Sequence, residues 1–238
     1  MTNKPVKKSD QEKGWIRPRP DRHFRPNPEF HLIVSEGTRT EPNYFRALAK
    51  NINSGEMLRG RTKRDYIQFY IEGVGKNTRD VFEDAVKAAR EIQSTESIVF
   101  QRVWVVYDKD DFDEDDFNVV QDLCKNQSNE DTKYSALWSN QCIELWFLLH
   151  FEYLTASLMR EDYCRKLSRH LKQHTKCTKY KKNSNNMFDF LLPFLETAME
   201  NSRRLYDSYQ NEDTPAKRDP ATLVFLIFDE LLPYISRP

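Results

Sequence analysis

The residues best placed to do chemistry are acids that follow two apolar runs. Glu36 comes just after residues 30–34, and Asp108 and Asp110 come just after residues 103–107. Alternate residues that leave a strand point the same way, so the two aspartates can converge. Carboxylate oxygens are hard ligands that suit Mg²⁺ or Mn²⁺. Glu36 could complete such a metal site or serve as a general acid or base.

The acidic stretch that starts at Asp108 also has a simpler interpretation. Residues 108–116 hold seven acids in nine positions, as a solvated loop would. Acids are favoured in the first turn of a helix, which accounts for residues 113–116. The helix dipole does not explain why the acids begin at the end of a strand. A metal site and a solvated acidic loop both stay open on spacing alone.

The elements that would position these acids alternate along the first half of the chain. Such alternation predicts an α/β fold with a parallel sheet, in which functional groups collect at the carboxyl ends of the strands. Apolar runs and β-branched residues predict strands at residues 30–34, 66–71, 103–107 and 134–138. Capping residues and helical periodicity predict helices at residues 42–51, 78–92 and 113–124.

The second half of the chain is predicted to be mostly helical. Helices are expected at residues 142–151, 160–171, 186–206 and 221–232, with Pro193 ending or kinking the third. We therefore divide the chain into a flexible basic arm, residues 1–28, and a domain, residues 29–238. The helical extension of that domain begins at about residue 142.

The charge balance excludes a uniformly basic nucleic-acid binder, because 37 Lys and Arg match 37 Asp and Glu. The arm differs from the whole: it has eight cations against three anions, and it holds five of the eleven prolines. It is either a solvated tail or a contact to phosphates or a partner. No apolar run could span a bilayer, and the four cysteines form no CxxC pair, so we expect a cytoplasmic protein without membrane contact.

Longer sequence blocks resemble a known family. Glu36-Gly37, followed later by Asp108-x-Asp110, is similar to the Toprim signature of topoisomerases, primases and OLD-type nucleases. Residues 36–45, 107–111, 139–151, 180–182 and 219–222, in that order, resemble the RloB-like family. The resemblance covers about residues 30–235, and it departs at Gln141, where the family pattern has proline.

The resemblance implies a fold, an activity and partners. The fold would be a Toprim-like, Rossmannoid parallel sheet flanked by helices. The activity would be that of a Mg²⁺- or Mn²⁺-dependent nuclease that cleaves phosphodiester bonds of DNA or RNA, with tRNA among the candidates. RloB-like proteins belong to bacterial anti-phage defence and restriction loci, so an ABC/SMC-like ATPase is the expected partner besides nucleic acid.

The resemblance also implies roles for individual residues. Glu41 matches a second acid of the glutamate motif, and Glu144 and Lys182, or Lys181, match a later acid and lysine. The expected catalytic residues are Glu36, Asp108, Asp110 and Lys182. The expected metal ligands are Glu36, Glu41, Asp108, Asp110 and Glu144.

Cations outside the acidic site must hold the nucleic-acid backbone, because carboxylates without a metal repel phosphate. Each candidate could equally be an ordinary surface charge. The candidates are Arg39, Lys76, Arg79 and Lys181, together with Lys179, Lys182 and the arm.

Other functions remain open at this stage. The chain could be a non-catalytic regulatory or scaffolding subunit of a complex whose ATPase carries the activity, or a metal-dependent transferase that uses Asp-x-Asp. Residues 73–78 could form a phosphate-binding turn before a helix, although they do not match the Walker pattern. A weak zinc pattern is formed by Cys164, His170, His174 and Cys177.

Overall fold

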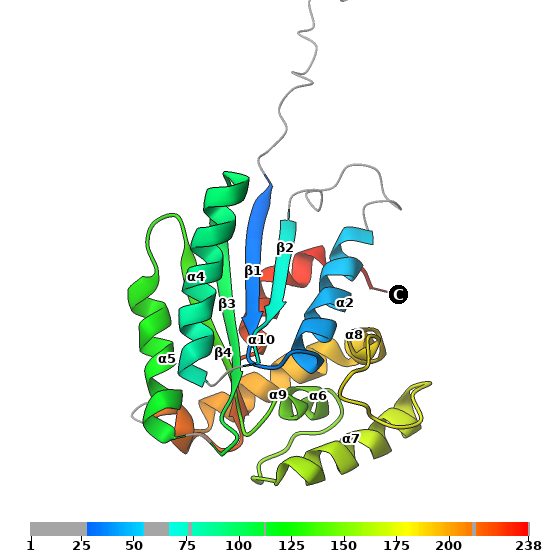
Figure 1. The fold of residues 1–238 in the computed structure, drawn as a ribbon. Coiled ribbons are helices and arrows are strands. Elements are labelled where there is room, and N and C mark those ends of the chain that lie inside the picture. The colour runs from blue at the N-terminus through cyan, green and yellow to red at the C-terminus, as the bar shows by residue number, and fades with distance from the viewer. Residues whose placement is uncertain (1–27, 55–66, 76–77, 112, 211–212, 238) are drawn as a thin grey trace, which may run out of the picture.

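The protein has a five-stranded sheet in the order β2-β1-β3-β4-β5 (Figure 1). The computed structural model describes residues 28–54, 67–75, 78–111, 113–210 and 213–237. Four strands run parallel, and β5 pairs antiparallel with β4. Their bounds are β1 Glu29–Ser35, β2 Ile67–Gly73, β3 Phe100–Asp108, β4 Lys133–Asn140 and β5 Ala221–Thr222.

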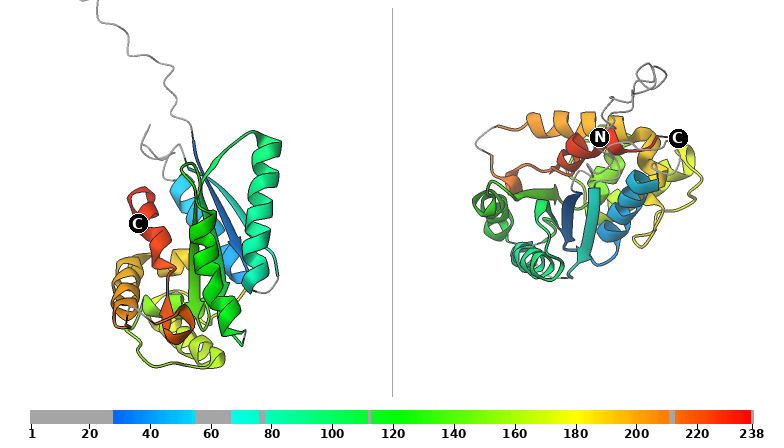
Figure 2. Two further views of the ribbon diagram at one scale, coloured as in Figure 1. Left: turned by 90° about the vertical axis from the view of Figure 1, so that its left-hand side faces the viewer. Right: turned by 90° about the horizontal axis from the view of Figure 1, so that it is seen from above.

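The central strands are apolar because helices cover both faces of the sheet. Residues 32–35 of β1 and 103–108 of β3 are all buried. Helices α4 (Thr78–Glu96) and α5 (Glu114–Gln127) cover one face, and α2 (Thr40–Ser54) lies on the other with the helices of the second half (Figure 2).

The path of the chain creates a switch point between β1 and β3. The chain leaves β1 for β2 on one side and then crosses back to β3 on the other. Consecutive connections in opposite directions place their helices on opposite faces and leave a crevice where the carboxyl ends of β1 and β3 diverge. Ligand sites of open parallel sheets form in this crevice, and the acids of interest follow these two strands.

The second half of the chain packs its helices on the face that carries α2. These helices are α6 Glu144–Leu149, α7 Arg160–His174, α8 Met187–Leu191, α9 Leu195–Asp207 and α10 Phe225–Leu231. Trp146 of α6 stacks on Phe228 of α10 at 5.2 Å and donates a hydrogen bond to the Tyr44 hydroxyl of α2 at 2.9 Å. Both halves of the chain therefore share one core.

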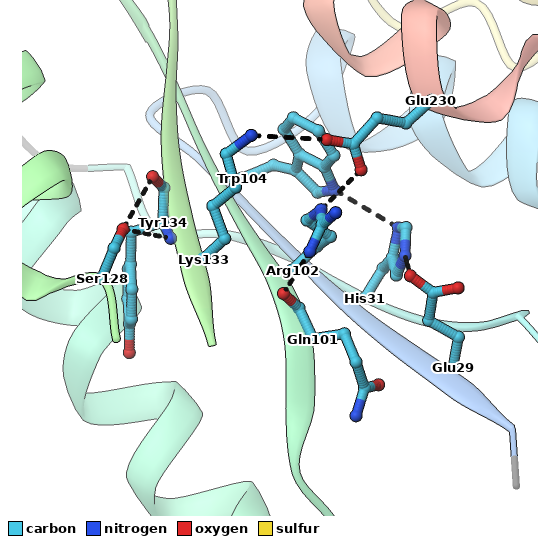
Figure 3. Close-up of polar contacts among 9 residues, drawn as sticks. All are labelled: Glu29, His31, Gln101, Arg102, Trp104, Ser128, Lys133, Tyr134 and Glu230. Atoms are coloured by element: carbon cyan, nitrogen blue, oxygen red, sulfur yellow. Dashed lines mark hydrogen bonds and ion pairs between the residues drawn. The ribbon is translucent and has the colours of Figure 1, made fainter. Parts of the chain in front are cut away.

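Ion pairs fix α10 at the opposite, amino end of the sheet (Figure 3). Glu230 of α10 accepts from Arg102 of β3 at 2.5 Å and pairs with Lys133 of β4 at 3.7 Å. His31 is buried beside them: its Nδ1 accepts from Trp104 at 3.4 Å, and its Nε2 contacts Glu29 at 3.1 Å. These contacts clamp α10 across two strands, far from the carboxyl ends.

The predicted fold class, a Rossmannoid parallel sheet flanked by helices with a mostly helical second half, is confirmed. The helix predicted at residues 186–206 is divided at Pro193 by a 3₁₀ turn, Leu192–Phe194, as proline requires. The helix predicted at residues 221–232 is wrong at its start, where β5 pairs with Ser139 and Asn140. Within the described residues, no helix is both long and apolar enough to cross a bilayer.

Candidate active site

Backbone hydrogen bonds bring the ends of β1, β3 and β4 together. The Glu36 amide donates to the Val106 carbonyl at 2.9 Å, and the Lys109 amide donates to the Ser139 carbonyl at 3.0 Å. The Asp108 amide, in turn, points at the Glu36 carboxylate, 3.4 Å from Oε2. Glu36 and Asp108, which are 72 residues apart in the chain, are therefore neighbours at the switch point.

Asp108 and Asp110 converge, as their spacing predicts, and they converge on an arginine. Asp110 has φ of 39°, a left-handed conformation that aspartate tolerates better than most residues. Its amide donates to the Gln141 carbonyl at 3.0 Å, which holds this turn. The guanidinium of Arg160, the first residue of α7, lies 2.8 Å from Asp110 Oδ2 and 3.6 Å from Asp108 Oδ2.

Glu41 reaches the site because the residue at position 37 is glycine. Glu41 lies in the first turn of α2 and is buried. A Cβ added at Gly37 would lie 2.0 Å from Glu41 Oε2 and would collide with the whole carboxylate. The Glu-Gly pair after β1 thus supplies one acid and makes room for a second.

Glu144 joins the group from the first residue of α6. Its Oε1 accepts a hydrogen bond from the Tyr180 hydroxyl at 2.9 Å, and the Cys164 thiol lies 3.8 Å from the same oxygen. Its other oxygen, Oε2, is buried and has no hydrogen-bond partner among the described residues, and the same is true of Oδ1 of Asp108. Buried carboxylate oxygens without partners are costly, so these two atoms are the ones best placed to bind a cation.

The carboxylates disturb one another electrostatically. Burial raises the pKa of Asp108 well above its usual value, and the charges of Glu41, Glu144, Asp110 and Glu36 raise it further. Burial also raises the pKa of Glu36 to about 7, with Asp110 and Glu41 adding to the effect. The acids cannot all ionise together without a cation among them.

The set of donor atoms fits a hard divalent cation. In this structure, however, the guanidinium of Arg160 is the positive charge beside Asp108 and Asp110. Five carboxylates provide only oxygen ligands, and two of their oxygens lack partners, which is the chemistry that Mg²⁺ and Mn²⁺ require. As the side chains stand, no three His, Cys, Asp or Glu of the described residues are grouped closely enough to hold a metal. Arg160 balances the charge of Asp108 and Asp110 instead.

A comparison with family models decides where this chain belongs. The model described as RloB-like protein matches residues 31–231, which include every one of these carboxylates. The chain belongs to the RloB-like family. No curated protein and no solved structure matched it.

Lys182, the lysine that the resemblance assigns to the site, lies on a loop that is tied to α2. Lys182 is exposed, and its charge is among the causes that lower the pKa of Asp110, which burial nevertheless keeps above its usual value. The Lys182 carbonyl accepts from the Thr40 hydroxyl at 2.8 Å, and the Asn183 carbonyl accepts from Asn43 at 3.3 Å. These two bonds hold the loop at the edge of the acidic cluster.

The predicted nucleic-acid contacts are less closely tied to the acids. Lys181 is exposed beside Lys182. Arg39 and Arg79 are also exposed, and no side-chain contact within the described part of the chain joins either of them to the carboxylates. Lys76 lies outside the described residues, as do residues 1–27 of the predicted arm.

Sequence reasoning missed Arg160 altogether and missed a role for Tyr180. Arg160 opens a polar helix after Met159, and nothing in its spacing separates it from other surface arginines. Tyr180 stands in a block that resembles the RloB-like family, which is the only signal that could have marked it. Only the folded chain shows that both touch the acids.

Neither of the two weaker sequence patterns forms a site within the part of the chain that the structure describes, which leaves out residues 76 and 77 of the first. In the turn after β2, the Val74 and Gly75 amides donate to the Ser35 and Glu36 carbonyls at 2.9 and 2.8 Å, so neither is available for a phosphate. The zinc pattern is also not assembled within the described residues. His170 and His174 stack on Phe151 instead.

Proposed function

We propose that this protein is a Mg²⁺- or Mn²⁺-dependent nuclease that cleaves phosphodiester bonds of DNA or RNA. The observation that carries the proposal is the set of carboxylates at the β1/β3 switch point, with Asp108 Oδ1 and Glu144 Oε2 buried and without partners. Membership of the RloB-like family supports it. Acids that lie close together and repel one another lower the stability of the fold. A bound cation would offset that cost.

Each residue of the site has a role in this proposal. The chemistry supplied by a bound divalent cation is polarisation of the scissile phosphate and a lowered pKa of water. The carboxylates that would hold it are Glu36, Glu41, Asp108, Asp110 and Glu144. Glu36, whose pKa is raised to about 7 by burial, can also take or release a proton near neutral pH.

The two cations beside the acids suit the charge that develops on the phosphate. Arg160 bonds Asp110 and is partly exposed, so its guanidinium can exchange a carboxylate oxygen for a phosphate oxygen. Lys182 is exposed next to it and can neutralise charge in the transition state.

The wider role of the protein follows from its family. We propose that it acts in bacterial anti-phage defence and works with an ABC/SMC-like ATPase. Family membership is the only support for this part of the proposal.

The test compares one buried acid with one exposed acid of the same stretch. Asp108→Asn should lower Mn²⁺-dependent cleavage of DNA, RNA or tRNA by at least about 100-fold, because it removes a ligand. Asp116→Asn makes the same change of charge on the exposed first turn of α5 and should cleave like wild type. Both are assayed with and without the ATPase, and calorimetric Mn²⁺ titration should show weaker binding by Asp108→Asn alone.

The results that contradict the proposal are specific. Equal cleavage by Asp108→Asn and wild type would refute the role of the site. Intact substrates under all conditions, together with no measurable Mn²⁺ binding, would refute the nuclease.

A second function is favoured by one observation, the ion pair of Arg160 with Asp108 and Asp110. A protein whose acids are permanently neutralised in this way would be a regulatory or scaffolding subunit. Full defence activity of Asp108→Asn in cells that carry the ATPase would favour this alternative.

A further inference from the structure

A strongly basic segment of α7 and the loop after it lies beside the acidic cluster. Residues 163–182, which comprise most of α7 and the loop after it, contain no acid. Most of the cations are exposed, Lys166 being partly buried against Glu152 of the preceding segment. The eight cations are Arg165, Lys166, Arg169, Lys172, Lys176, Lys179, Lys181 and Lys182.

Helix α7 presents part of this charge as a stripe. Tyr163, Leu167 and Leu171 are buried and hold one face of the helix against the protein. Arg165, Arg169 and Lys172 follow at intervals of four and three residues, so they share another face, and all three are exposed. Arg165 also pairs with Asp162 of the preceding turn. Seven residues of helix span about 10 Å, which corresponds to about three nucleotide steps of a strand at about 3.4 Å each.

Contacts on either side tie this segment to the site. Three residues before it, Arg160 at the start of α7 pairs with Asp110 at 2.8 Å. At its end, Tyr180 bonds Glu144 at 2.9 Å, and the Lys182 carbonyl accepts from Thr40. Figure 1 shows α7 lying beyond the carboxyl ends of the strands, across the same edge that holds the acids. The basic segment therefore lies next to the acidic cluster, and Tyr180 and Lys182 near its end contact the cluster and α2.

We propose that α7 and its loop bind the phosphodiester backbone of the nucleic acid and lead it to the acidic cluster. This inference rests on the substrate class of the proposed function. We name the surface formed by Arg165, Arg169, Lys172, Lys176, Lys179 and Lys181 the basic track. The cluster of carboxylates repels a polyanion, so affinity must come from cations beside it, and the basic track is the acid-free stretch that borders it.

The test measures binding without cleavage. Wild type, Arg165→Ala/Arg169→Ala/Lys172→Ala, and Lys50→Ala/Lys87→Ala/Arg90→Ala are compared in EDTA. The last variant removes the same number of exposed cations from α2 and α4. Fluorescence anisotropy is recorded with single-stranded DNA, single-stranded RNA and duplex DNA of one length, between 50 and 200 mM salt.

The expected result is a smaller salt dependence in the first variant alone. Loss of three phosphate contacts should reduce the slope of log K against log salt by about 2 for single strands and about 2.7 for duplex DNA. The α2/α4 variant should keep the wild-type slope. A polymer whose slope falls by the amount expected for its own kind, about 2 for a single strand or about 2.7 for duplex DNA, is one that lies on the basic track.

A second variant and a stability measurement guard against misfolding. Lys176→Ala/Lys179→Ala/Lys181→Ala changes only the loop, where no helix can be disrupted, and should also reduce the slope by about 2. Thermal unfolding of each variant is compared with wild type. Folded α7 and loop variants that bind like wild type, an equal loss in the α2/α4 variant, or no binding of any polymer by wild type would overturn the inference.

The inference and the proposed function can fail separately. Loss of binding in the α7 variant, together with undiminished cleavage by Asp108→Asn, would refute the metal site and leave the basic track standing. Normal binding by the α7 variant, with cleavage abolished in Asp108→Asn, would refute the basic track and leave the metal site standing.

Discussion

At the scale of residues, the acids of the site differ in how readily they can be predicted from the sequence. Glu36, Asp108 and Asp110 could be predicted from the sequence because a carboxylate directly after an apolar strand must lie at the edge of the sheet. Glu41 and Glu144 could be placed only by resemblance, since each begins a helix, where acids are common. Arg160 carries no local signal, because only the folded chain brings α7 to the end of β3.

Gly37 offers a test at this scale. Gly37→Ala should displace the Glu41 carboxylate, since the new methyl group would occupy its position. We expect Mn²⁺ affinity to fall by about 10- to 100-fold, the usual effect of losing support for a metal ligand, with little change in secondary structure. Calorimetric titration measures the affinity, and Thr38→Ala in the same turn is the control. An unchanged affinity in Gly37→Ala would remove Glu41 from the set of metal ligands.

At the scale of elements, α10 supports two helices of the site although none of the clustered acids comes from it. Phe228 of α10 is fully buried and stacks on Trp146, two residues after Glu144 in α6. Tyr44 of α2 lies against the same two rings. The helices that begin with Glu41 and Glu144 are thus packed on a shared aromatic support.

Removing that support should reduce stability and loosen the site. Phe228→Ala should lower the free energy of unfolding by about 3–5 kcal/mol, as for other fully buried phenylalanines. Met159→Ala, at a side chain that is 67% exposed, should stay within about 0.5 kcal/mol of wild type. Urea denaturation measures both variants. A loss below about 1 kcal/mol in Phe228→Ala would show that α10 does not support α6.

Elements were predictable to the extent that a repeating pattern reveals them. The buried strands and the amphipathic helix α4 each repeat a pattern over seven or more residues. Strand β5 has two residues, too few for any periodicity, and only its contacts define it: the Leu223 amide donates to the Trp138 carbonyl at 2.8 Å. Its neighbours Val224 and Phe225 are apolar, so the whole stretch reads as one helix.

At the scale of the whole molecule, we predict that the acidic cluster makes stability depend on pH and on a bound cation. Glu36 has a folded pKa of about 7, above its ordinary value of 4.5. Its contribution is therefore present below about pH 4.5 and is lost as pH rises through 7. His150 acts in the opposite direction: burial lowers its pKa to about 3, so the folded state loses stability as pH falls below about 6.5. Comparing wild type with Glu36→Gln at each pH isolates the contribution of Glu36, because both proteins contain His150.

The prediction concerns the metal-free protein between pH 5 and pH 8. Relative to Glu36→Gln, wild type should lose about 2 kcal/mol of unfolding free energy over this range, allowing for the partial exposure of Glu36. Mn²⁺ at about 100 times its Kd should stabilise wild type by about 2.7 kcal/mol at pH 8. Thermal and urea unfolding measure both effects. If the unfolding free energies of wild type and Glu36→Gln changed in parallel with pH, the raised pKa of Glu36 would be contradicted.

The acids and the basic track differ in how the chain supplies them. The carboxylates come from positions 36 to 144 and meet only when three strands and two helices are in place, whereas the basic track is one continuous stretch. Substitutions along that stretch can accumulate without disturbing the sheet, while a change to the acids requires several distant positions to adapt together. The basic track can therefore be altered by exchange of a single segment, whereas the acidic cluster cannot.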